Sequence, residues 1–360
     1  MPKRKERTTF VLMRLRSSPT FFAAARQPYW QFSRDSRVRR PSTLPLRIIG
    51  VLLGITLSFP ALLQSAPPNV VIIMPDDLSW NDFSYFNPAG AQTPAIDALA
   101  RTSVRLTDFH VSPTCSPTRA SLLTGRYSNA TGVWHTILGR YFLRTDEMTL
   151  ADVLKPAGYR SAVFGKWHLG DSYPFRPRDR GFDHSIVFRG GGADQQHNLW
   201  GNRNLPPAVA FVDDLPRAIP EKSSAGIPTY ATTYFTSQAI AFMEEQVALQ
   251  QPFFAYLAYN VAHLPHDRPP ASRPGISDQQ AVVEHLDQQV GRVLAFLKSA
   301  AIEESTIVIF LTDNGSASAH FRAGKASPFE GGHRVPCFIR WPAGGVGGSV
   351  SSAREMPYLS

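Results

Sequence analysis

The chain has 360 residues, of which 43% are hydrophobic, and this composition fits a globular protein with one large α/β domain or two smaller ones. Residues 1–47 contain 12 of the 37 Lys and Arg residues but only 2 of the 28 Asp and Glu residues, so the net charge of +9 originates there. The remainder has 25 basic and 26 acidic residues, and this balance argues against a nucleic-acid-binding face.

An apolar run over residues 48–63 follows this basic segment, an order that is typical of a secretory signal. The run is short and contains Pro60, which disfavours a transmembrane helix, although an uncleaved membrane anchor is the alternative. We therefore predict a leader over residues 1–66 and a folded domain over residues 67–360. The folded part is expected to be exported, to a periplasmic, secreted or lysosome-like location, and to contact a membrane only if the signal stays uncleaved.

Apolar strand-like runs alternate with helical stretches along the rest of the chain. Strands are predicted over residues 69–74, 104–111, 159–164, 253–259, 306–311 and 335–341. Helices are predicted over residues 93–101, 117–125, 149–154, 230–250 and 277–300, and a loop-rich stretch over residues 171–228. This alternation predicts an α/β/α sandwich around a large, mostly parallel sheet.

Polar side chains follow four of the predicted strands, at the edge where open α/β sheets bind ligands. They are Asp76 and Asp77, Lys166 and His168, Asn260 and His263, and Asp313 and Asn314. The carboxylate and amide oxygens of the first and last pairs suit Ca²⁺ or Mg²⁺ and are poor ligands for zinc. Either pair alone would be read as an ordinary turn, but together they predict a site for a hard cation.

Lys166 and His168 flank Trp167, so in an extended segment their side chains point to the same face and can reach one anion. A lysine and histidine pair is often only a solvated edge. Here Gly165 and Gly170 on either side indicate a close approach of the backbone.

Cys115 precedes a predicted helix that has Pro117 in its first turn and Gly125 as its C-terminal stop. The positive end of this helix and Arg119, one turn further on, favour an anion beside the cysteine. A lone cysteine in such a place is most simply a buried core residue, as we expect for Cys337, the other cysteine in the chain. Two cysteines are too few for a disulfide scaffold.

Three segments together resemble the type I sulfatases of the alkaline phosphatase superfamily. They are the run from Cys115 to Gly125, the Gly-Lys-Trp-His-Leu-Gly segment from Gly165 to Gly170, and Lys325 ahead of Glu330-Gly331-Gly332. The resemblance covers residues 68–345 and implies an alkaline-phosphatase-like fold. It further implies that a formylglycine-generating enzyme oxidises Cys115 to formylglycine (3-oxoalanine). Residue 115 would then bind Ca²⁺ together with Asp76, Asp77, Asp313 and Asn314.

The activity implied by the resemblance is that of a sulfuric ester hydrolase acting on aryl or carbohydrate sulfates. In that family the aldehyde is hydrated, and one hydroxyl, activated by Asp313 and Ca²⁺, attacks sulfur. The second hydroxyl then expels sulfate, with His168 as the base.

The remaining site residues are also assigned from the resemblance. Lys166, Lys325 and Arg119 would bind the sulfate oxygens, and His263 would contact the substrate and protonate the departing alcohol. At His333 the family usually has an apolar residue, so this position departs from its pattern.

Family members usually continue for a further hundred residues or so, so we expect a C-terminally truncated catalytic domain that lacks a small C-terminal subdomain. The partner would be a sulfated small molecule or a sulfated polysaccharide. Two alternatives stay open at this point. One is a phosphate or phosphonate ester hydrolase of the same superfamily, and the other is an inactive truncated or unmatured protein that at best binds sulfated ligands.

Overall fold

The computed structural model describes residues 66–193, 195, 209–222, 229–316, 321–348 and 350–351, which all belong to one unit of the chain, Leu63–Ser360. The predicted leader, apart from Ala66, lies outside the described residues, as do residues 352–360. Within the described ranges no helix is long and apolar enough to cross a membrane.

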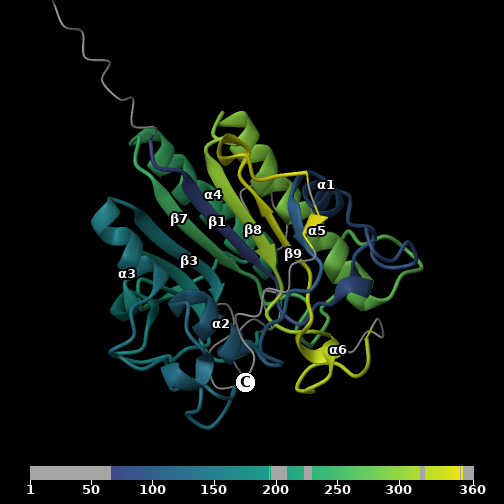
Figure 1. Cartoon of the computed structure of the whole chain (residues 1–360), viewed down its shortest axis with the longest axis horizontal. Coiled ribbons are helices and arrows are strands. Elements are labelled where there is room, and N and C mark those ends of the chain that lie inside the picture. Colours follow the sequence, from purple (N-terminus) through teal and green to yellow (C-terminus); the bar gives the residue numbers. More distant parts are fainter. Residues whose placement is uncertain are drawn as a thin grey trace, which may run out of the picture. The chain divides into compact units, whose positions relative to one another are not determined.

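A ten-stranded sheet forms the centre of this unit, with strand order β10-β2-β9-β8-β1-β7-β3-β4-β5-β6 (Figure 1). The strands are β1 Asn69–Met74, β2 Val104–Leu106, β3 Arg160–Lys166, β4 His184–Phe188, β5 Val209–Val212, β6 Leu215–Ala218, β7 Phe253–Ala258, β8 Thr306–Leu311, β9 Cys337–Arg340 and β10 Val350–Ser351. From β8 through β4 every neighbouring pair is parallel, whereas β9, β5 and β6 pair antiparallel with their neighbours. The prediction of a mostly parallel sheet therefore holds for its centre, and the margins are mixed.

Helices cover both faces of the sheet. The α-helices are α1 Pro94–Thr102, α2 Cys115–Thr124, α3 Leu150–Leu154, α4 Ala231–Ala248, α5 Asp278–Ser299 and α6 Glu330–His333. Short 3-10 helices are η1 Trp80–Asp82, η2 Ser128–Thr131, η3 Lys155–Ala157, η4 Pro177–Arg180 and η5 Pro342–Gly344.

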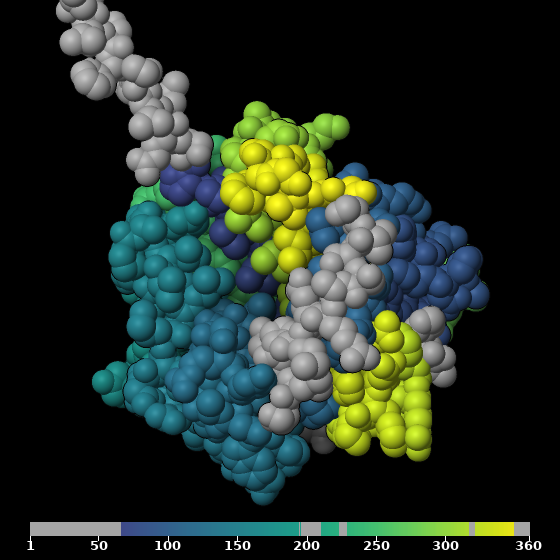
Figure 2. Space-filling view, viewed as in Figure 1, coloured from purple at the N-terminus to yellow at the C-terminus, as the bar shows by residue number. Residues whose placement is uncertain are grey.

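The helix layers on the two faces of the sheet each have their own hydrophobic core, because alternate side chains of a strand point to opposite faces. In β1, Val71 and Ile73 join the hydrophobic core under α1, α4 and α5, whereas Ile72 and Met74 join a second core under α2 and α3. This confirms the α/β/α sandwich. In the space-filling view, blue and teal residues of the α2 and α3 layer fill the lower left, and yellow-green residues ahead of β9 border the lower right (Figure 2).

One local prediction was wrong and another was incomplete. The strand expected over residues 104–111 ends as β2 at Leu106, and the following segment pairs again only at the single bridge between His110 and Arg334. The stretch over residues 171–228, expected to be loop-rich, contains β4, β5 and β6. Its hairpin turns at Asp213 and Asp214, which both have positive φ, a backbone that such turns usually obtain from asparagine or glycine.

Four adjacent parallel strands, β8, β1, β7 and β3, carry the polar residues singled out from the sequence. Because parallel strands end at the same edge of a sheet, these residues start from neighbouring strand tips although they span residues 76 to 314 of the chain. The topology thus gathers the candidate site at one edge.

Candidate functional site

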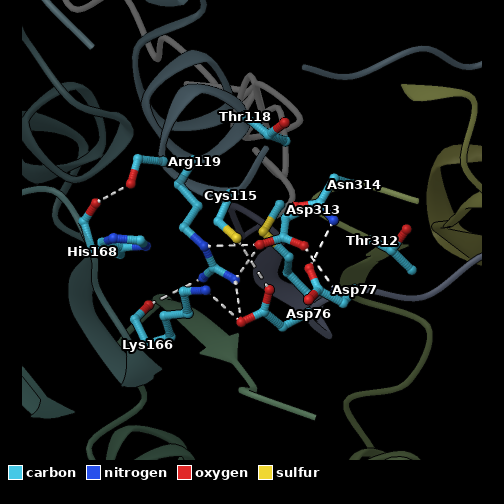
Figure 3. A network of polar contacts seen from close by, with 12 residues as sticks. Asp76, Asp77, Cys115, Thr118, Arg119, Lys166, His168, Thr312, Asp313 and Asn314 are labelled. Atoms are coloured by element: carbon cyan, nitrogen blue, oxygen red, sulfur yellow. Dashed lines mark hydrogen bonds and ion pairs between the residues drawn. The ribbon is translucent and has the colours of Figure 1, made fainter. Parts of the chain in front are cut away.

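Acidic residues from two strand tips meet the cysteine at this edge. Asp76 and Asp77 follow β1, Asp313 follows β8, and Cys115 begins α2. One ligand atom from each of these four residues lies within 4.8 Å of all the others (Figure 3). Asp76, Asp313 and Cys115 are buried. The structure therefore brings the predicted hard-oxygen ligands together, directly beside the thiol.

Asn314 supplies the observation that tests whether a cation fits. Its side-chain nitrogen donates to Asp77 Oδ1 at 2.7 Å and to the carbonyl of Gly315 at 3.0 Å. Its side-chain oxygen is buried and has no hydrogen-bond partner. A buried oxygen without a donor is costly, but it becomes favourable as a metal ligand. Three carboxylates and one amide oxygen are a donor set for Ca²⁺ or Mg²⁺, so the residues fit the implied ion.

Each carboxylate of the cluster is paired with a cation. Arg119 donates to Asp313 Oδ2 from Nε at 3.2 Å and from Nη2 at 2.7 Å. Lys166 Nζ contacts Asp76 Oδ2 at 2.5 Å. Lys325 Nζ lies 2.7 Å from Asp77 Oδ1. With all of these groups ionised, the three carboxylates and the three cationic side chains cancel. One bound divalent cation would therefore give the cluster a net positive charge, which attracts an anion.

Burial and charge shift the acidities within the cluster. Burial and the neighbouring Asp313 carboxylate raise the pKa of Asp76 to about 8, so the ionised form of Asp76 depends on nearby cations. For Asp313, burial opposes ionisation, but Arg119 and Lys166 outweigh it and lower the pKa. Burial raises the pKa of the Cys115 thiol, whose Sγ lies 3.4 Å from Asp76 Oδ1. The thiol is therefore held protonated and donates to that carboxylate.

Helix α2 places Cys115 and Arg119 on the cluster. The helix begins at Cys115, its N-cap is Thr114, and Gly125 ends it with φ 65°. This confirms the predicted helix and its glycine stop. Because Cys115 and Arg119 are one turn apart, both side chains point toward the strand tips (Figure 3). Arg119 is fully buried, and its Nη1 also donates to the carbonyl of Lys166 and to the Tyr256 hydroxyl.

His168 follows β3 and is held in one tautomer. Its φ of 54° is unusual for a residue other than glycine, and such strain is found most often at functional sites. Its Nε2 lies 2.9 Å from the carbonyl of Thr136, so Nε2 carries the hydrogen. Its Nδ1 is buried and has no hydrogen-bond partner. Burial and the charge of Lys166 hold the pKa of His168 well below its ordinary value, which leaves Nδ1 unprotonated.

His263 lies beyond the end of β7. Its Nδ1 is 2.8 Å from the carbonyl of Leu264, and burial together with Lys166 lowers its pKa. Nearby His266, which could be mistaken for it in the sequence, has its Nε2 3.0 Å from the carbonyl of Ala262.

Two glycines that we did not single out from the sequence cover these histidines. A Cβ on Gly191 would lie 2.4 Å from Cε1 of His168, and one on Gly192 would lie 3.0 Å from Cε1 of His263. Only glycine allows the backbone to pack on both imidazole rings in this way. The run of three glycines at residues 190–192, which is separated from the end of β4 by one residue, is the sequence signal that could have indicated it.

Lys325 reaches the cluster from a loop ahead of α6. The backbone N–H of the next residue, Ala326, donates to the carbonyl of Pro113 at 2.7 Å, which ties this loop to the segment that enters α2. All ten site residues selected from the sequence thus lie around the same strand edge. Eight of them belong to the cluster or contact it. The other two, His168 and His263, are near enough for the charge of Lys166 to lower their pKa. Their catalytic roles stay predictions.

The chain is similar to known proteins in sequence and in fold. A family model described as Sulfatase matches residues 68–355. N-acetylgalactosamine-6-sulfatase of Canis lupus familiaris is 32% identical, over 79% of this chain and 59% of its own length. Arylsulfatase G of Canis lupus familiaris is 32% identical, over 81% of this chain and 62% of its own length. The crystal structure of Ps i-CgsB in complex with k-i-k-neocarrahexaose matches with a TM-score of 0.72 and 27% identity, over 81% of this chain and 69% of that chain. The chain therefore spans less than two thirds of the length of these two curated relatives.

Proposed function

Since the chain belongs to the sulfatase family, we propose that it hydrolyses sulfate esters, with residue 115 as the nucleophile. One observation carries the proposal: Cys115 begins a helix, lies among three carboxylates suited to a hard cation, and is surrounded by Arg119, Lys166 and Lys325. Hydrolysis of a sulfate ester uses both the bound cation and the fixed positive side chains, because negative charge develops on oxygen as the bond to the alcohol breaks.

Two groups that the protein would acquire complete this site. Asp76, Asp77, Asp313, Asn314 and residue 115 would hold Ca²⁺, which would supply positive charge to the ester oxygens. Oxidation of the Cys115 thiol by a formylglycine-generating enzyme would supply an aldehyde that hydrates to give an oxygen nucleophile. The protonated thiol is a weaker nucleophile, because only the thiolate reacts readily.

The fixed cations of the chain bind and orient the ester. Arg119 and Lys166 are fully buried, so their charges act in a region of low dielectric constant. Lys325 reaches the same cluster from the loop ahead of α6. Together these three side chains bind the sulfate group beside residue 115 and neutralise the negative charge that develops on it.

Proton transfers fall to Asp313 and the two histidines. The carboxylate of Asp313, whose pKa is lowered, accepts a proton from the side chain of residue 115 as it attacks. His263, whose pKa is lowered in the free protein, takes up a proton when the anionic ester binds beside it and donates that proton to the departing alcohol oxygen. The unprotonated Nδ1 of His168 then takes a proton from residue 115 as sulfate leaves.

We further propose a sulfated carbohydrate as the substrate class. N-acetylgalactosamine-6-sulfatase is named for the sulfate ester of an amino sugar, and Ps i-CgsB was crystallised with k-i-k-neocarrahexaose. Export, suggested by the basic and apolar leader of residues 1–66, would bring the protein to such material.

The test is sulfate release by protein that is co-expressed with a formylglycine-generating enzyme and loaded with Ca²⁺. The tryptic peptide that contains residue 115 is weighed to measure conversion, and release is followed from an aryl sulfate and from defined sulfated sugars. Cys115→Ala should abolish release, whereas Cys337→Ala, which alters the other buried cysteine, should retain it. Fully converted, calcium-loaded protein that releases phosphate from phosphate esters but no sulfate would overturn the proposal.

A further inference from the structure

Two histidines outside the carboxylate cluster lie with their rings next to each other. His110 lies between β2 and α2, and His333 is the last residue of α6. Their Nδ1 atoms are 2.9 Å apart, and their ring centroids are 5.0 Å apart. Neither residue belongs to the carboxylate cluster. His333 is also the position at which the sequence departs from the pattern of the family.

Hydrogen bonds on the far side of each ring fix its tautomer. Nε2 of His110 lies 3.0 Å from Asp108 Oδ1, and Nε2 of His333 lies 3.2 Å from the carbonyl oxygen of Pro328. Both partners can only accept, so each Nε2 carries a hydrogen. In the neutral rings both Nδ1 atoms are then bare lone pairs that point at each other. Such a contact repels unless a proton or a metal ion lies between the two nitrogens.

Positive charge lies close to this pair. Arg334 lies 3.6 Å from Asp108 and shares the carboxylate that contacts Nε2 of His110. The acidic side chain of Glu330 is held by the same arginine at 3.0 Å. Burial lowers the pKa of His333. The geometry thus leaves the two Nδ1 atoms side by side as a pair of nitrogen ligands.

We propose that His110 and His333 bind a divalent transition metal ion of the zinc and copper class through their Nδ1 atoms. Imidazole nitrogen is a preferred ligand for these metals, in contrast to the oxygen ligands of the carboxylate cluster. An N–H held by a carboxylate or a backbone carbonyl on the opposite side of the ring is the usual environment of a metal-binding histidine. Both histidines have it.

The local geometry accommodates the ion and its water ligands. Zinc–nitrogen bonds of about 2.0–2.1 Å in a tetrahedral arrangement place the two nitrogens about 3.3 Å apart, so the rings need to separate by only about 0.4 Å. His333 borders a pocket of about 320 Å³, lined also by Ser112, Tyr127 and Trp134, through which water can reach the His333 side of the pair. With two protein ligands the site is exchangeable rather than structural.

A metal at this place would join two segments that lead into the sulfate site. His110 precedes Cys115 by a short stretch, and α6 follows the loop that carries Lys325. The backbone already connects them, because the N–H of Val111 donates to the carbonyl of His333 at 2.8 Å. Metal binding would therefore hold the Lys325 loop against the start of α2 and raise the melting temperature.

The test is a calorimetric titration with Zn²⁺ at pH 7.5, in excess Ca²⁺ to fill the carboxylate cluster. All proteins carry Cys115→Ser, so that this thiol cannot bind zinc. The parent should bind one zinc ion, and His110→Ala and His333→Ala should each lower the affinity at least about tenfold, because one of two ligands is lost. His184→Ala is the matched control, since His184, like His110, has one ring nitrogen beside a carboxylate (Nδ1, 2.9 Å from Asp213), but no histidine among the described residues is paired with it.

Circular dichroism verifies that each variant is folded, and His333→Asn serves if His333→Ala is not. The signal of bound Cu²⁺ in electron paramagnetic resonance should show coupling to two nitrogens in the parent and to one in either variant. Equal zinc affinity in the parent and both histidine variants would overturn the proposal. So would a folded parent that binds no zinc at pH 7.5, which would leave the pair sharing a proton only.

Discussion

Gly191→Ala should impair catalysis through His168 without unfolding the protein. The φ of Gly191 lies outside the left-handed region, so alanine fits the backbone, but its Cβ would lie 2.4 Å from Cε1 and 2.6 Å from Nε2 of His168. Ordinary van der Waals contact begins at 3.4 Å, so the ring must move by about 1 Å. That shift also disturbs the 2.9 Å contact between Nε2 and the carbonyl of Thr136, which sets the tautomer.

A displacement of about 1 Å at a reacting group can cost about 100-fold in rate, or about 2.7 kcal/mol in the barrier. We therefore expect kcat for sulfate release to fall by about two orders of magnitude in Gly191→Ala. Gly192→Ala should cost less, because its Cβ would lie 3.0 Å from His263 and requires a shift of only a few tenths of an ångström. The assay is sulfate release at saturating substrate, divided by the fraction of residue 115 that mass spectrometry finds converted.

A double-mutant cycle separates this mechanism from a general disturbance of the loop. In a His168→Ala background the ring is absent, so adding Gly191→Ala should cost nothing further. A Gly191→Ala enzyme as fast as the parent, or an undiminished penalty in the His168→Ala background, would refute the reasoning.

Two further predictions concern the cation and the pH dependence of stability. Asn314→Ala removes the unpartnered side-chain oxygen and should weaken Ca²⁺ binding about tenfold or more, whereas Asn314→Asp should retain Ca²⁺ binding. The rise in melting temperature on adding Ca²⁺ measures the affinity of each variant. An unchanged rise in the alanine variant would count against Asn314 as a ligand. His285 is half-buried, and its pKa falls from 6.5 to about 4 through partial burial and then the charge of Arg292. Its contribution to stability is complete above pH 6.5 and is lost as the pH falls toward 4, because the unfolded chain binds the proton more tightly; at pH 5 the loss is about 2 kcal/mol. Urea titrations at pH 7.5 and pH 5 should show His285→Phe losing less stability on acidification by that amount, and parallel losses in the two proteins would contradict it.

The sequence was most informative where strands end. Asp76, Asp77, Asp313 and Asn314 directly follow runs of buried apolar residues, and the parallel centre of the sheet brings the ends of β1 and β8 side by side. The cysteine helix was equally predictable, because Gly125 has the left-handed backbone that its position as a stop requires. Both predictions rest on local patterns within a few residues.

Contacts between distant segments could not be predicted in the same way. Tyr256 lies within β7 and has the appearance of an ordinary core residue, yet its hydroxyl receives a hydrogen bond from Arg119. The pairing of His110 with His333 joins residues 223 positions apart. The β4, β5 and β6 strands were missed because Pro, Gly and Arg dominate the stretch around them, and the β5–β6 turn uses two aspartates.

The ion pairs of Lys166 with Asp76 and of Lys325 with Asp77 link the affinities of two different ligands. A cation that coordinates these aspartates competes with both ammonium groups for the same oxygens and so releases them toward an anion. An anion that draws the ammonium groups away exposes the carboxylates to the cation in turn. Because such coupling is thermodynamically reciprocal, calcium and a sulfate-like anion should each tighten the binding of the other by the same factor.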